Sequence, residues 1–95
     1  MLTGKQKRYL RSLAVNQRSL FQIGKDGLSY NLVASLGDSL EAHELVKVNL
    51  LKTCEGDIKE IAFDLAMHTH SEVVQIIGRT IVLYRPSKER KIVLP

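Results

Sequence analysis

The sequence predicts a single compact α/β domain with the element order α-β-α-β-α-β-β and a four-stranded mixed sheet. Its length of 95 residues is enough for one hydrophobic core and leaves too little chain for a second. Segments with the apolar spacing of helices alternate with short apolar segments typical of strands, which favours parallel strand pairs. The last two strand-like segments are joined by a tight turn at Gly78, and this hairpin adds an antiparallel pair.

The first element is a helix with a basic side. Thr3 and Gln6 have the spacing of a capping box, in which each side chain satisfies a backbone N–H at the start of the helix. On a helical wheel one arc is apolar and holds Leu2, Tyr9, Leu10, Leu13 and Ala14. The opposite arc is entirely basic and holds Lys5, Lys7, Arg8 and Arg11. A polar helix face normally carries both signs of charge, so this arc is unusual.

The next part of the chain predicts a strand, a loop, a second helix and a second strand. Residues 20–23 form the first strand, which residues 24–27 close. Ser29 can cap the second helix, whose apolar residues recur at helical spacing, although Gly37 interrupts that pattern. Residues 45–51 form the second strand. Its two sides alternate, one with Val46, Val48 and Leu50 and the other with Lys47 and Asn49.

The last part predicts a third helix and a hairpin. Residues 54–56 form a turn, after which Asp57 and Glu60 open the helix at capping spacing. The stripe of this helix that faces the core is complete and holds Ile58, Ile61, Ala62, Leu65 and Ala66. Residues 73–77 and 81–84 are the two strands of the hairpin.

Composition and motifs argue against several classes of protein. The apolar stretches are too short to span a membrane and the N-terminus lacks an apolar signal region, so we expect a cytoplasmic protein. The single cysteine, Cys54, excludes an internal disulfide. No Walker loop, nucleophile elbow or His-Glu-x-x-His motif is present. His43, His68 and His70 lack the paired spacing of zinc ligands. We therefore expect no enzyme activity, no metal site and no cofactor.

Charge is distributed unevenly along the chain. The formal net charge is +4, but residues 1–25 hold six Lys or Arg side chains and no acid. Residues 26–78 hold nine acids against three lysines, and residues 79–95 hold five basic side chains against Glu89. This segregation is typical of a polyanion-binding face built from both ends of a chain. A solvated surface followed by a basic tail would show the same pattern.

The tetrapeptide Gly24, Lys25, Asp26 and Gly27 precedes the second predicted helix. Two glycines let the backbone approach a ligand closely, and the N–H groups at a helix N-terminus favour a phosphate. KH domains clamp a nucleic-acid backbone with a Gly-x-x-Gly loop of this kind, whereas the alternative is an ordinary surface turn. Together with the basic helix, the tetrapeptide favours RNA binding. Five scattered aromatic residues do not form a stacking platform, so we expect backbone contacts to structured RNA.

Four sequence blocks together resemble the CRM domain (chloroplast RNA splicing and ribosome maturation), most closely its stand-alone bacterial YhbY/YqeI-like form. The blocks are residues 2–7 with Leu10 and Arg11, residues 24–27, residues 44–48 and residues 77–85. The resemblance implies a fold similar to the C-terminal domain of translation initiation factor three. It also implies RNA binding and association with precursors of the large ribosomal subunit. The contacts that it implies are Lys5, Arg11, Gly24, Lys25 and Gly27.

We therefore predict a CRM-like RNA-binding domain at residues 1–86 and a basic C-terminal tail at residues 87–95. The protein would bind structured ribosomal RNA in pre-50S particles as a monomer, without a membrane, and assist maturation of the large subunit. Charge adds Lys7, Arg8, Arg79 and Arg85 to the predicted RNA contacts. The tail could pack on the sheet through residues 92–94 or be a disordered basic arm.

Two other functions remain open at this point. The first is an RNA-binding factor that acts on the small subunit or on messenger RNA, which the fold shared with the initiation factor would permit. The second is a protein-interaction adaptor whose acidic middle holds a basic partner such as a ribosomal protein. The acids of that surface would be Glu41, Glu44, Asp57, Glu60 and Asp64. Salt-sensitive RNA binding by the isolated protein would argue against the adaptor as the sole role.

Overall fold

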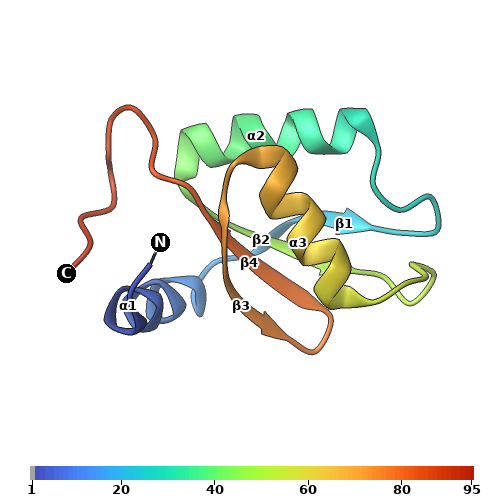
Figure 1. Cartoon of the computed structure of the whole chain (residues 1–95), viewed down its shortest axis with the longest axis horizontal. Helices are drawn as coiled ribbons and strands as arrows, with labels where there is room; N and C mark the ends of the chain where they lie inside the picture. Colours follow the sequence, from blue (N-terminus) through green and yellow to red (C-terminus); the bar gives the residue numbers. More distant parts are fainter. Residues whose placement is uncertain (1) are drawn as a thin grey trace.

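The computed structural model describes residues 2–95, and the elements in this range follow the predicted order (Figure 1). The helices are α1 (Gly4–Ala14), α2 (Tyr30–His43) and α3 (Ile58–Thr69). The strands are β1 (Ser19–Ile23), β2 (Leu45–Leu50), β3 (Glu72–Ile77) and β4 (Thr80–Tyr84). The predicted fold class and element order are therefore confirmed, and each strand differs from its predicted range by one residue at one end.

The strands form one mixed sheet in which β4 lies between β2 and β3. The strand order is β1-β2-β4-β3. β1 pairs with β2 in parallel, whereas β4 is antiparallel to both of its neighbours. In the central pair, Leu45 lies opposite Tyr84 and Asn49 lies opposite Thr80. Alternating helices and strands predicted parallel pairs, and the β1–β2 pair is parallel. The other two pairs are antiparallel, because the β3–β4 hairpin places β4 beside β2.

The two faces of the sheet are covered differently (Figure 1). α2 and α3 pack on one face and bury the larger core, toward which Val46, Val48 and Leu50 of β2 point, as their alternation predicted. α1 packs on the other face over a smaller core. The buried members of that core are Leu10, Ala14, Leu45, Val74, Val82 and Tyr84. A single helix cannot cover four strands, so part of this face stays open and Ile77 of β3 is 58% exposed.

Local sequence determines where the helices begin. Thr3 and Gln6 form the predicted capping box: the Gln6 N–H donates to the Thr3 hydroxyl at 3.1 Å and the Thr3 N–H donates to Gln6 Oε1 at 3.0 Å. Ser29 caps α2 by accepting from the Leu32 N–H. Gly37 does not end α2, because one glycine costs a helix only about 1 kcal/mol and buried side chains flank it.

Residues 87–95, the C-terminal segment, leave β4 and turn back beside α1 (Figure 1). Ile92 and Leu94 pack against the smaller core. Gln6 Nε2 donates a hydrogen bond of 3.3 Å to the Pro95 carbonyl oxygen. The segment therefore takes the packed arrangement of the two that the sequence left open.

Candidate nucleic-acid interface

The basic arc of α1 faces solvent, because two buried residues on the opposite arc, Leu10 and Ala14, fix the helix to the sheet. We call this arc the cationic face of α1, and its members are Lys5, Lys7, Arg8 and Arg11. All four are exposed except Lys7, which is half-buried. The ion pairs found within residues 2–95 all lie elsewhere, so none of these four side chains is paired with a carboxylate.

A groove of about 220 Å³ lies between α1 and the open part of the sheet, and we call it the α1 groove. It is lined by Arg11, Ala14, Val15, Lys47, Gln75, Ile77, Thr80 and Val82. Arg11 and Lys47 give the groove positive charge, and Lys47 Nζ is held by the Gln17 carbonyl oxygen at 3.1 Å. Lys47 lies on the side of its strand that the alternation predicted, but it was not among the predicted contacts, because only the assembled fold shows that α1 covers that side.

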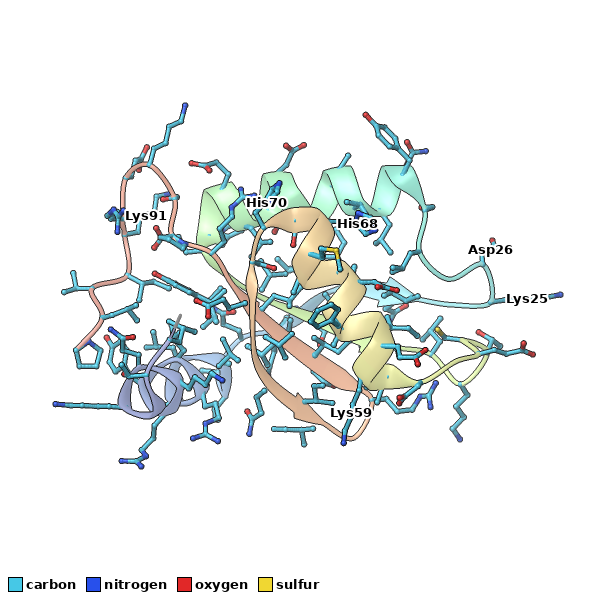
Figure 2. All side chains as sticks on the ribbon, viewed as in Figure 1. Lys25, Asp26, Lys59, His68, His70 and Lys91 are labelled. Atoms are coloured by element: carbon cyan, nitrogen blue, oxygen red, sulfur yellow. The ribbon has the colours of Figure 1, made fainter. Side chains whose placement is uncertain are left out.

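The loop of residues 24–27, here the 24–27 loop, connects β1 to α2 and is a tight turn. The Gly27 N–H donates to the Gly24 carbonyl oxygen at 3.0 Å, and Gly27 has a φ of 65°, which favours glycine. Lys25 and Asp26 at its tip are exposed and point away from the molecule (Figure 2). A phosphate could therefore approach the backbone of this loop, with the Lys25 ammonium beside it and the Asp26 carboxylate opposing it.

The cationic face and the 24–27 loop do not come together in space. The longest dimension of the molecule is 37 Å, and α1 lies at one end of this axis while Lys25 lies at the other (Figures 1 and 2). A ligand that touches both regions must therefore extend along most of the molecule.

Arg79, another predicted contact, has internal partners. It lies in the β3–β4 turn, and its Nε donates to the Leu50 carbonyl oxygen at 3.0 Å. Its Nη2 donates to the carbonyl oxygens of Leu51 at 2.6 Å and Cys54 at 3.4 Å. The guanidinium group thereby fixes the chain that follows β2. Gly24 lies against Leu51 and Thr53 of that chain, so Arg79 stabilises the position of the 24–27 loop indirectly.

Arg85 is also occupied within the fold, by partners on α2 and α3. Its Nη1 donates to the Thr69 carbonyl oxygen at 3.0 Å, and its Nη2 donates to the Gly37 carbonyl oxygen at 3.0 Å. The same Nη2 pairs with the Glu41 carboxylate at 3.3 Å. Arg85 therefore joins the end of α3 to the middle of α2. The charge of Arg85 is evident from the sequence, but its carbonyl partners carry no sequence signal.

Glu44 was predicted to belong to an acidic surface, and this is wrong, because its side chain is fully buried, at 0% exposure. Its carboxylate accepts hydrogen bonds from the C-terminal segment, among them two from Ser87 at 2.7 Å each. Burial would raise the pKa of Glu44, but the hydrogen bonds from Ser87, Ile92 and Lys91 hold that pKa below its ordinary value of 4.5. Glu44 therefore cannot face a basic partner, whereas Glu60 and Asp64 on α3 are exposed.

Within the described part of the chain, no group of three or more His, Cys, Asp or Glu side chains is arranged to hold a metal ion. His68 and His70 lie at the end of α3, where positive charge is favoured (Figure 2). Cys54 is a buried free thiol. None of the helices within residues 2–95 has the length and apolar character that crossing a bilayer requires.

Comparisons with known proteins agree with the resemblance noted in the sequence. Residues 2–85 match the CRS1 / YhbY (CRM) domain. The chain is 50% identical over 91 residues to Probable RNA-binding protein YqeI of Bacillus subtilis, which covers 96% of this chain and 95% of that protein. It is 36% identical over 94 residues to a Haemophilus influenzae protein named RNA-binding protein, with coverages of 99% and 95%. The solution structure of the Staphylococcus aureus protein SAV1595 matches it with a TM-score of 0.85 and 55% identity, covering 100% of both chains.

Proposed function

Since the chain belongs to the CRS1/YhbY (CRM) domain family, we propose that it is a non-enzymatic RNA-binding protein that contacts structured ribosomal RNA and assists assembly of the large ribosomal subunit. The names of the Bacillus and Haemophilus relatives support the RNA-binding part of this proposal. The large subunit as the target is supported by the resemblance to the stand-alone bacterial CRM proteins.

The observation that carries the proposal is the cationic face of α1, whose side chains form no ion pair among the described residues. Lys5, Arg8 and Arg11 are exposed on one arc, and Lys47 extends the positive charge into the α1 groove. Lys and Arg side chains that release counterions from phosphates supply most of the sequence-independent affinity for nucleic acid. This arrangement therefore fits a polyanion better than a neutral ligand.

The mode of binding follows from the side chains that the interface offers. Tyr9 and Tyr30 are the exposed tyrosines, at 39% and 87%, and they lie on different helices. Phe63, the third exposed aromatic residue, lies on α3, and three rings on three different helices do not make a platform for successive bases. Contacts to phosphates and sugars therefore contribute most of the binding affinity, and they recognise the shape of an RNA more than its sequence.

The distance between the two contact regions favours a folded RNA. The cationic face and the 24–27 loop lie toward opposite ends of a molecule 37 Å long. A rigid RNA helix or a junction keeps phosphates at fixed separations over such a span, whereas a short single strand would lose conformational entropy to reach both regions. Structured ribosomal RNA meets this requirement.

Sedimentation of a cell lysate through a sucrose gradient tests the target. At low salt we expect the protein with free large subunits or their precursors, and we expect it to leave them as salt rises. If the protein migrates with small subunits, its target is the small subunit, as in the alternative that rests on the fold shared with the initiation factor. A protein that stays at the top of the gradient at both salt concentrations would overturn the ribosomal proposal.

A second candidate function is docking of a basic protein on α3. Phe63 and Met67 lie one helical turn apart and are 65% and 56% exposed, with the acids Glu60 and Asp64 beside them. An exposed apolar pair between acidic side chains fits a basic segment with an apolar anchor. The double variant Phe63→Ser/Met67→Ser should then no longer sediment with the ribosomal particle, while its affinity for isolated ribosomal RNA should stay at the wild-type value. Unchanged sedimentation would exclude this docking site.

A further inference from the structure

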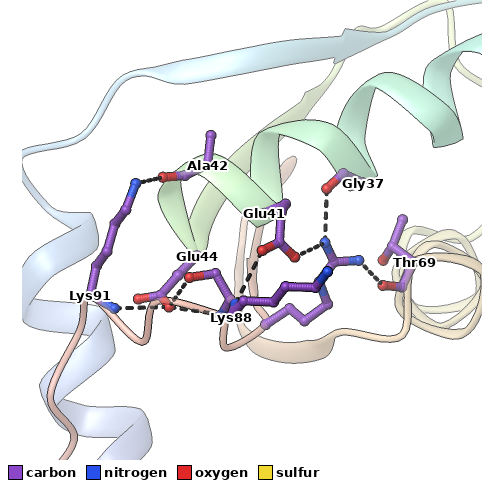
Figure 3. A network of polar contacts seen from close by, with 9 residues as sticks. Gly37, Glu41, Ala42, Glu44, Thr69, Lys88 and Lys91 are labelled. Carbon is purple, nitrogen blue, oxygen red and sulfur yellow. Dashed lines mark hydrogen bonds and ion pairs between the residues drawn. The ribbon is translucent and has the colours of Figure 1, made fainter.

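The most extensively bonded side chain outside the candidate interface is Glu44, at the end of α2 (Figure 3). Its Oε2 accepts from the Ser87 N–H at 2.7 Å, the Ser87 hydroxyl at 2.7 Å and the Lys91 N–H at 3.1 Å. Its Oε1 accepts from the Ile92 N–H at 2.6 Å. One carboxylate thus binds four donors of the C-terminal segment, and it fixes the bend of residues 87–92.

The backbone at Glu44 reinforces this attachment. Glu44 has a φ of 68°, which L-residues rarely adopt, and its own carbonyl oxygen accepts from the Arg85 N–H at 2.9 Å. A buried carboxylate is stable only when hydrogen bonds replace its lost hydration, and here the donors are supplied by residues 87–92. Attachment of the C-terminal segment and burial of Glu44 therefore depend on each other.

The attached segment carries basic side chains and lies toward the same end of the longest axis as α1 (Figure 1). Lys88 and Arg90 are exposed. Within the described chain each donates a hydrogen bond through its backbone N–H, Lys88 to the Glu41 carboxylate and Arg90 to the Ser87 carbonyl oxygen. Lys91 differs, because its Nζ donates to the Ala42 carbonyl oxygen at 2.8 Å. The hydrogen bond from Gln6 to Pro95 brings the end of the segment to the first turn of α1. Lys88 and Arg90 thus have ammonium and guanidinium groups without a protein hydrogen bond.

We propose that the C-terminal segment is a second RNA-contact element, in which Lys88 and Arg90 add cations at the α1 end of the molecule and Glu44 is the positioning residue. This inference rests on the proposed RNA-binding function. It goes beyond the family match, which ends at residue 85. A tethered pair of cations binds phosphates with a smaller loss of entropy than the same cations on a free tail.

The test compares two variants that change charge in different places. Lys88→Gln/Arg90→Gln removes the two proposed contacts. Lys59→Gln is the control, because it removes an exposed cation on α3, on the face of the sheet opposite α1. The probe is transcribed large-subunit ribosomal RNA, and affinity is measured over a series of salt concentrations. We expect the salt slope of the double variant to fall by roughly 0.7–0.9 for each lost contact, while Lys59→Gln keeps the wild-type slope.

Glu44→Gln tests the positioning role separately. We expect faster amide hydrogen exchange at residues 87–92 and weaker RNA binding at each salt concentration, because the released segment must be ordered on binding. A role in folding alone would change hydrogen exchange and leave affinity for the RNA at its wild-type value. Because the exposed Lys88 and Arg90 can be replaced without disturbing the core, the double variant decides the proposal even if Glu44→Gln unfolds.

The outcomes separate this inference from the function on which it rests. If the double variant keeps the wild-type slope while Lys5→Gln/Arg8→Gln lowers it, the C-terminal segment is not a contact and the RNA-binding function stands. If the wild-type protein itself does not bind the RNA, the proposed function fails and the inference fails with it.

Discussion

Nη2 of Arg79 donates a hydrogen bond of 2.6 Å to the carbonyl oxygen of Leu51. This bond connects the β3–β4 turn to the chain that follows β2, and the Leu51 side chain in turn lies where a Cβ on Gly24 would touch it, at 3.5 Å. An arginine predicted from charge as an RNA contact therefore acts first as a support for the loop that we propose to bind RNA.

Substitution of Arg79 should separate support from direct contact. Arg79→Lys keeps the charge but cannot reproduce a guanidinium that donates to three carbonyl oxygens. We expect the free energy of unfolding to fall by about 1–3 kcal/mol, measured by urea denaturation. We also expect weaker RNA binding with an unchanged salt slope, since the loop moves but no phosphate contact is lost. A stable variant with a flatter slope would instead identify Arg79 as a contact.

Charge reversal at both contact regions should act additively. Arg11→Glu and Lys25→Glu lie toward opposite ends of the molecule, so their effects on RNA binding should sum in the double variant. We expect each to flatten the salt slope by roughly 0.7–0.9 and to weaken binding across all RNA sequences, with circular dichroism unchanged. Wild-type affinity and slope in the double variant would show that the proposed interface is wrong.

The two glycines of the 24–27 loop should respond differently to alanine. Gly27 has a φ of 65°, so Gly27→Ala should lower the free energy of unfolding by about 1–2 kcal/mol. An alanine Cβ at Gly24 would make ordinary contacts of 3.5 Å with Leu51 and Thr53, so that variant should stay within about 1 kcal/mol of wild type. RNA affinity should nevertheless fall in Gly24→Ala if the backbone approaches phosphate there. Unchanged affinity would exclude close approach at Gly24.

The stability of the fold should depend on pH through Glu44. Hydrogen bonds lower the pKa of Glu44 in the folded protein below its ordinary value of 4.5, so folding favours the carboxylate. The stabilisation is complete above the ordinary pKa and is lost as pH falls through the lowered one. Urea denaturation between about pH 6 and pH 3 should show a steeper loss in wild type than in Glu44→Gln. Parallel curves for the two proteins would contradict this role.

Elements whose signals are local could be predicted from the sequence. The capping box of Thr3 and Gln6 and the alternation of Val46, Val48 and Leu50 involve neighbours a few residues apart, and the structure confirms both. The basic arc of α1 was predicted for the same reason. Its cations depend only on helical spacing and on which arc is apolar.

Features that depend on distant partners could not be predicted. The carbonyl partners of Arg79 lie 25 to 29 residues away, and a backbone carbonyl carries no sequence signal. Glu44 looked like a surface acid because nothing in its neighbours shows that residues 43 to 48 positions later fold back onto it. The separation of the 24–27 loop from α1 likewise depends on the direction of β1, which only the assembled sheet determines.

The hydrogen bond between Gln6 and Pro95 places the first turn of α1 and the end of the chain side by side, at the end of the molecule opposite the 24–27 loop. A polypeptide that enters at residue 2 and leaves at residue 95 therefore does so at one corner. The domain can be inserted into a longer protein, or repeated along one, with short linkers that never cross the loop. Joining the two ends and opening the chain elsewhere should likewise yield a folded circular permutant.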